Sequence, residues 1–125
     1  MIEYKVIKTY EDLKVFRVSF ELANRIYGIS KVFPREEKYS LTDQVLRSSR
    51  SVASNICEGW AKRKYHNVFI RHLYDAVGSC EETRVWLSMA KACGYLSIDD
   101  FESLDSQYGE VGAMLAGLIK KWKTY

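Results

Sequence analysis

The stretch Leu41–Gly59, LTDQVLRSSRSVASNICEG, decides the fold, because it divides into two distinct faces when it is placed on a helix. The apolar face consists of Leu41, Val45, Leu46, Val52, Ala53, Ile56, Cys57 and, just beyond the stretch, Trp60. The opposite, narrow face consists of Gln44, Arg47, Ser51, Ser54, Asn55 and Glu58. Serine and asparagine compete with a helix for its hydrogen bonds, so helix propensity does not account for this polar face.

Two interpretations of the polar face remain open. It is either a hydrogen-bonded seam between helices or subunits, or a surface for a ligand or a nucleic acid. We expect a structural seam, in which short side chains permit a close helix contact. Its predicted members are Gln44, Arg47, Ser51, Asn55, Glu58 and, from a later helix, Glu82.

Apolar spacing predicts three more helices, at about residues 11–32, 66–92 and 98–121, around the one at 41–61. Pro34 should end the first helix, Ser40 with Asp43 should cap the second, and Gly59 and Gly94 should close the second and third. We therefore predict one all-α domain over residues 1–125, an antiparallel up-down-up-down four-helix bundle. Its predicted core contains Leu13, Phe20, Val45, Val52, Leu73, Leu87, Leu104 and Leu115.

The first and third helices carry more apolar surface than the core of one bundle requires. We expect the surplus to form the interface of a homo-oligomer, with the candidate residues Val15, Val18, Leu22, Val68, Trp86 and Met89. Gly78, in the middle of the third helix, predicts a close approach between helices, because glycine otherwise weakens a helix.

Several function classes find no support in the sequence. It contains no nucleotide-binding glycine loop and no recognisable catalytic motif, so we expect no enzyme and no cofactor. Cys57, Cys80 and Cys93 are too widely spaced for a zinc site, and we expect no bound metal. No apolar run is long enough to span a membrane and no signal peptide is recognisable, so the expected location is cytoplasmic.

Positive charge is concentrated in the first half of the chain. Residues 1–65 contain 13 Lys/Arg and 8 Asp/Glu, whereas residues 66–125 contain 6 and 8, within a formal net charge of +3. Such asymmetry is compatible with an anionic partner. The candidate nucleic-acid contacts are Arg17, Arg25, Arg47, Arg50, Lys62, Arg63 and Lys64.

The sequence also resembles a known family. The resemblance rests on Asp12-Leu13-x-Val15-Phe16, Phe33-Pro34-x-x-Glu37-x-Tyr39-x-Leu41, Gln44-x-x-Arg47, Ser51, Asn55-Ile56-x-Glu58-Gly59 and Gly78-Ser79-x-x-Glu82. These motifs are similar to those of the four-helix-bundle proteins encoded in intervening sequences of bacterial 23S ribosomal RNA genes. The chain departs from the common pattern with Ser48, Ser49 and Cys57, all of them small residues.

The resemblance implies an antiparallel bundle that assembles into a homopentamer and has no established enzymatic activity. It also implies a relation to the accessory protein of diversity-generating retroelements, which binds nucleic acid and a reverse transcriptase. From residues and resemblance together, we expect a non-enzymatic homo-oligomer that binds structured RNA or DNA. The expected oligomer is a pentamer. The alternative is a protein–protein scaffold without nucleic-acid binding, and an enzyme comes third.

Overall fold

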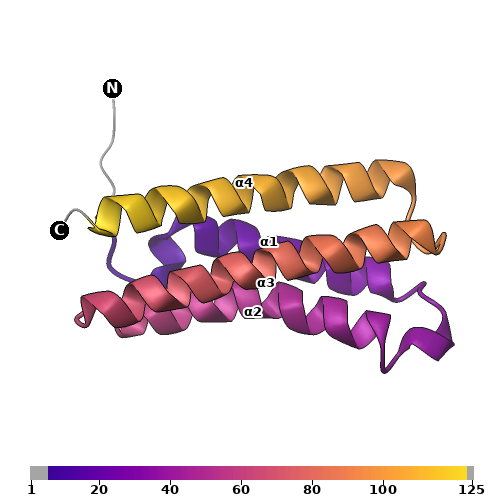
Figure 1. The fold of residues 1–125 in the computed structure, drawn as a ribbon, viewed down its shortest axis with the longest axis horizontal. Helices are drawn as coiled ribbons and strands as arrows, with labels where there is room; N and C mark the ends of the chain where they lie inside the picture. Colours follow the sequence, from indigo (N-terminus) through magenta and orange to yellow (C-terminus); the bar gives the residue numbers. More distant parts are fainter. Residues whose placement is uncertain (1–5, 124–125) are drawn as a thin grey trace.

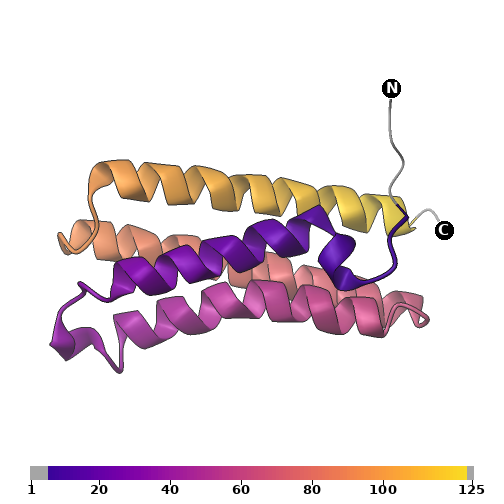
Figure 2. The same cartoon turned by 180° about the vertical axis from the view of Figure 1, so that it is seen from behind.

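The computed structural model describes residues 6–123, which form four α-helices and two short 3-10 turns, with no strand in that range (Figure 1). The elements are η1 (Tyr10–Asp12), α1 (Lys14–Ser30), η2 (Arg35–Glu37), α2 (Leu41–Ala61), α3 (His66–Ala92) and α4 (Ile98–Lys123). Successive helices run in opposite directions in both views (Figures 1 and 2). The predicted all-α four-helix bundle is confirmed. Residues 1–5 and 124–125 lie outside the described range.

The first helix is shorter than predicted at both ends. The chain makes the turn η1 before it, in which the Asp12 carboxylate accepts backbone N–H groups from Lys8 and Thr9 at 2.9 and 3.1 Å. Leu13 is extended, with φ −79° and ψ 120°, so α1 starts only at Lys14. It ends at Ser30, four residues before the proline that disfavours further helix.

Only part of the apolar surface of α1 faces the core. Val15, Leu22 and Ile26 are at most 5% exposed and face inward, whereas Phe20 is 51% exposed. The prediction of Phe20 as a core residue is therefore wrong. Val15 and Leu22 were predicted at an oligomer interface, which is also wrong, because this single chain already buries them. The other predicted core residues are buried: Leu13, Val45, Val52, Leu73, Leu87, Leu104 and Leu115.

Glycine marks the closest approach of α2 and α3, but at a different position from the one predicted. A Cβ on Gly59 would lie 2.8 Å from His72 Cβ and 3.1 Å from Phe69 Cδ1, so only glycine fits without a shift. Gly59 is thus buried inside α2 and does not end it. Gly78 is exposed and has nothing within 4 Å of an added Cβ, so the close contact expected there is absent.

Helix ends and an ion pair fix the arrangement of α3 and α4. Gly94 has a φ of +78°, the left-handed conformation that glycine adopts freely after a helix. Ser97 Oγ accepts the backbone N–H of Asp100 at 3.1 Å and so caps the start of α4. The Arg84 guanidinium donates two hydrogen bonds to the Asp105 carboxylate, at 2.9 and 3.3 Å, which raises the pKa of Arg84 further and ties the two helices together.

The connection between α1 and α2 is organised by Glu37. Ser40 Oγ donates to its carboxylate at 2.6 Å and the Tyr95 hydroxyl at 3.0 Å. These two hydrogen bonds, the one from Ser40 first, lower the pKa of Glu37. The Ser40 hydroxyl is thus engaged with the preceding turn and does not cap α2. The predicted capping box of Ser40 and Asp43 is wrong, although α2 starts at the predicted residue.

Candidate nucleic-acid interface

Part of the polar face of α2 lies against α3. The hydroxyls of Ser51 and Ser79 are 2.8 Å apart, and Asn55 Nδ2 donates to the backbone carbonyl of Ser51 at 3.0 Å. Asn55 Oδ1 lies 3.1 Å from His72 Nδ1, and His72 Nε2 lies 3.7 Å from a Glu58 carboxylate oxygen. Because these groups partner one another between two helices, this part of the face is occupied by structural contacts.

The same contact continues into the core at Ser48 and Thr83. Both residues are buried, at 2% and 0% exposure, and their hydroxyls are 2.9 Å apart. Thr83 Oγ1 also lies 2.8 Å from the backbone carbonyl of Ser79. A buried hydroxyl needs such partners, since an unpaired one costs about 1–3 kcal/mol.

Three predicted seam residues lie elsewhere. Gln44 is half-buried near the start of α2, and Arg47 and Glu82 are exposed on α2 and α3. Within residues 6–123, none of these three side chains forms a hydrogen bond or an ion pair. The seam therefore consists of Ser51, Asn55 and Glu58 from the predicted set, together with His72 and Ser79, which were not among the predicted seam residues.

The four candidate arginines of α1 and α2 have different surroundings. Arg25 is engaged by α4: its Nη1 lies 3.1 Å from Ser103 Oγ and its Nη2 3.8 Å from an Asp100 oxygen. Arg17 donates to the backbone carbonyl of Glu11 at 2.9 Å. The Arg50 guanidinium lies 5.7 Å from the Tyr27 ring centroid, and both Arg50 and Arg47 are exposed. Arg25 thus serves the contact with α4, while Arg47 and Arg50 present their charge to solvent.

The turn between α2 and α3 carries three consecutive exposed cations, Lys62, Arg63 and Lys64. The Arg63 guanidinium stacks over the Trp60 ring at 4.2 Å and donates to the Trp60 carbonyl at 2.9 Å. Lys62 Nζ lies 3.8 Å from a Glu58 oxygen, an exposed pair that contributes little to stability. The charges of this turn are available to an anionic partner.

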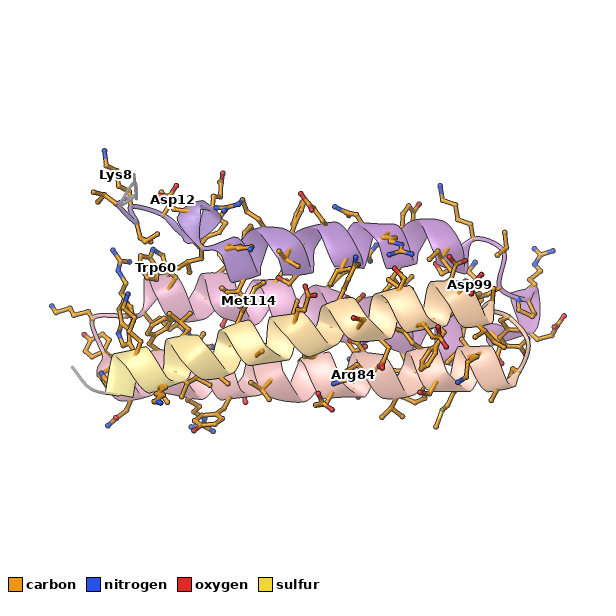
Figure 3. The ribbon with its side chains drawn as sticks, turned by 90° about the horizontal axis from the view of Figure 1, so that it is seen from above. Lys8, Asp12, Trp60, Arg84, Asp99 and Met114 are labelled. Carbon is orange, nitrogen blue, oxygen red and sulfur yellow. The ribbon has the colours of Figure 1, made fainter. Side chains whose placement is uncertain are left out.

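The fold brings further cations to the same end of the molecule. The C-terminal part of α4 packs beside the α2–α3 turn, where the Trp122 ring centroid is 5.9 Å from that of Trp60 and 4.9 Å from that of Phe69 (Figure 1). Lys120 and Lys121 are exposed on this part of α4. Lys8 lies at the same end as Trp60, and Asp99 at the opposite end (Figure 3). We call this group the basic end; its members are Lys8, Lys62, Arg63, Lys64, Lys120 and Lys121.

Acidic residues are sparse around the basic end. No Asp or Glu occurs in residues 59–74, which contain the turn, nor in residues 111–123, the last half of α4. The nearby carboxylates are Glu11, Asp12 and Glu58; Asp12 accepts backbone N–H groups and Glu58 pairs with Lys62. The opposite end carries both signs, the acidic residues Glu36, Glu37, Asp99, Asp100 and Glu102 and the basic residues Lys31, Arg35, Lys38 and Lys91. The positive excess is therefore found at the basic end, while the opposite end is close to neutral.

No group of three or more His, Cys, Asp or Glu side chains in residues 6–123 is arranged to hold a metal ion. None of the helices in that range combines the length and the apolar character that crossing a membrane demands.

Known proteins resemble this chain in sequence and in fold. Residues 11–117 match the family model described as 23S rRNA-intervening sequence protein. A crystal structure from Bacteroides thetaiotaomicron, described as a protein of unknown function from the S23 ribosomal protein family, is 30% identical with a TM-score of 0.77. The similarity covers 85% of this chain and 95% of that chain. No curated protein matches the sequence.

Proposed function

Because the chain belongs to the 23S rRNA-intervening sequence protein family, we propose that it is a non-enzymatic homo-oligomer that binds nucleic acid, structured RNA above all. The basic end carries this proposal. Six cations from the N-terminal arm, the α2–α3 turn and α4 gather there around an aromatic cluster of Trp60, Phe69 and Trp122. Arg47 and Arg50 on α2 supply a second, smaller set of exposed charges.

Contacts of this kind bind phosphate and discriminate little between sequences. Each phosphate that the protein neutralises steepens the fall of affinity with salt, by about 0.9 in the logarithmic slope for duplexes. An oligomer repeats the basic end, so one RNA that spans several copies would gain avidity from contacts that are individually weak.

The test is a retention assay with structured RNA at about 50 mM salt, where electrostatic binding is strong. The triple variant Lys62→Glu, Arg63→Glu, Lys64→Glu should lose binding and remain folded. A matched control reverses three exposed cations at the opposite end, Lys31→Glu, Arg35→Glu, Lys38→Glu, and changes the net charge equally. Equal loss in both variants, or no retention by the native protein, would refute the basic end as the interface and favour the protein–protein scaffold.

Self-association is supported by large apolar side chains that the single chain leaves exposed. Phe20 and Tyr27 on α1 are 51% and 46% exposed, and Val85 and Met89 on α3 are 50% and 47% exposed. These are two different surfaces, and a contact between unlike surfaces of identical chains builds rings when the rotation closes. From the predicted interface set, Val68, Met89, Val18 and Trp86 remain at least partly accessible. The number five comes from the family resemblance alone.

Sedimentation equilibrium at micromolar concentration tests the assembly. We expect an oligomer that dissociates in the variants Phe20→Lys and Met89→Lys, which place a charge on each surface. A native monomer would contradict self-association, whereas a stable dimer or tetramer would contradict only the pentamer.

A further inference from the structure

Two charged residues predicted for the polar seam have no partner inside the chain. Arg47 on α2 and Glu82 on α3 are exposed, and neither side chain forms an ion pair or a hydrogen bond within residues 6–123. The polar face of α2 predicts a seam between helices or between subunits, and the pairing of Ser51 with Ser79 supplies the contact between helices. Arg47 and Glu82 are therefore available for a contact between subunits.

Glu82 lies on a stripe of α3 that faces away from the core. Residues three, four and seven positions apart share one side of a helix, so Glu82 is flanked by Val85 and Met89, which are 50% and 47% exposed. Asp75, also exposed, continues the stripe towards the start of α3, and Arg71 ends it. We call these five residues the acidic stripe, because it combines exposed apolar side chains with two carboxylates and one guanidinium.

The groove between α1 and α2 has the complementary character. A cleft of about 310 Å³ lies there, lined by Phe20, which is 51% exposed, by Arg50 and by uncharged side chains. Arg50 is the only charged residue that lines this cleft, and Arg47 lies three residues before it on α2, also exposed. The neighbouring cleft along α1 carries charges of both signs. We call Phe20, Arg47 and Arg50 the basic groove.

The opposite charges of the two surfaces lie at the same level along the bundle. Ser48, between Arg47 and Arg50 in sequence, has its hydroxyl 2.9 Å from that of Thr83, the residue after Glu82. A rotation axis parallel to the helices keeps each residue at its level from one copy to the next. A ring of identical chains around such an axis would therefore bring Glu82 of one copy level with both arginines of its neighbour.

The two surfaces cannot close on each other within one molecule. In the described residues α1 and α3 make no contact with each other, and each packs against α2 and α4. A second copy can join them as a contact between unlike surfaces. We propose that the acidic stripe of one copy packs into the basic groove of the next, with Glu82 at Arg47 and Arg50. This assignment rests on the proposed function and deepens it: the two arginines then serve assembly, and RNA binding is left to the basic end.

Charge reversal on each surface tests the contact. One variant is Glu82→Arg and the other is Arg47→Glu, Arg50→Glu; all three residues are exposed, so the fold should be retained, as circular dichroism would establish. The matched control is Glu110→Arg, which makes the same change of charge at an exposed position on α4.

Sedimentation equilibrium at micromolar concentration measures the assembly. Each reversed variant alone should associate at least about ten-fold more weakly than the native chain, because like charges then meet across the contact. Glu110→Arg should associate as the native chain does. An equal mixture of the two reversed variants should form oligomers that contain both chains, since every contact in the mixture again joins opposite charges. Recovery on mixing requires that the charges pair between chains and not within one.

The outcomes separate this contact from the proposed function. A native oligomer that tolerates both reversals overturns the contact and leaves self-association standing. Loss of assembly in both variants without recovery on mixing also overturns the pairing of Glu82 with the arginines. A native monomer overturns the contact and self-association together. RNA binding is decided separately by the Lys62→Glu, Arg63→Glu, Lys64→Glu variant.

Discussion

Replacing Gly59 with alanine adds a methyl group at the tightest point between α2 and α3. The new Cβ would lie 2.8 Å from His72 Cβ, where carbon atoms normally stay about 3.5–4.0 Å apart. His72 Cβ is attached directly to the backbone, so the two helices must separate by about 1 Å locally. That shift also lengthens the contacts of the seam next to it, including the 3.1 Å contact between Asn55 and His72.

The magnitude follows from two opposing effects. Overpacking of this kind costs about 1–3 kcal/mol, whereas alanine is about 1 kcal/mol better than glycine inside a helix. With the weakened seam contacts included, we expect a net loss of about 1–2 kcal/mol in the free energy of unfolding. At about 3–5 °C per kcal/mol for a chain of this size, the melting temperature should fall by several degrees.

Gly78→Ala is the matched control, because nothing lies within 4 Å of an added Cβ on this exposed helical residue. It should gain up to about 1 kcal/mol from helix propensity alone. Chemical denaturation of both variants, monitored by circular dichroism, compares the two free energies at the same oligomeric state. A Gly59→Ala protein as stable as the native one, or a destabilised Gly78→Ala protein, would refute the assignment of the close helix contact.

Three further outcomes are expected. Thr83→Val removes a buried hydroxyl and leaves its serine partner on α2 without that contact, which should lower the free energy of unfolding by about 1–3 kcal/mol in denaturant titrations. Burial raises the pKa of the Cys80 thiol to about 11, whereas Cys93 is exposed. At pH 8 a thiol reagent should therefore modify Cys93 first and Cys80 only on unfolding, and mass spectrometry of partly labelled protein measures this order. Tyr95→Phe removes one of the hydrogen bonds that lower the pKa of Glu37. A lowered carboxyl pKa stabilises the fold at neutral pH, and this stabilisation is lost as the pH falls through the pKa of the folded state. The difference in melting temperature between native and variant protein should therefore shrink on acidification, and a difference that grows would contradict the assignment.

The architecture could be predicted from sequence because each helix carries a strong apolar period and the connections are short. The limits of α2 and α3 matched the prediction, whereas α1 starts three residues later than predicted, because the chain forms the turn η1 there and Leu13 is extended. Which apolar residues of α1 face the core could not be decided from that helix alone. It depends on how α2 and α4 pack against it, and this packing turns Leu22 inward and Phe20 outward. The same dependence on a partner helix explains why the close contact lies at Gly59 and not at Gly78.

The distribution of charge shows why the candidate interface was only half visible in the sequence. Comparing residues 1–65 with 66–125 placed the positive excess in the first half, and the lysines of α4 fell in the acidic half. An antiparallel bundle sorts residues by end and not by half, so Lys120 and Lys121 come to lie beside the α2–α3 turn (Figure 1). The predicted up-down topology already places the end of the fourth helix beside the connection between the second and third helices. Summing the charges at each end of the bundle would therefore have included Lys120 and Lys121. Lys8 could be added only once the path of the N-terminal segment was known.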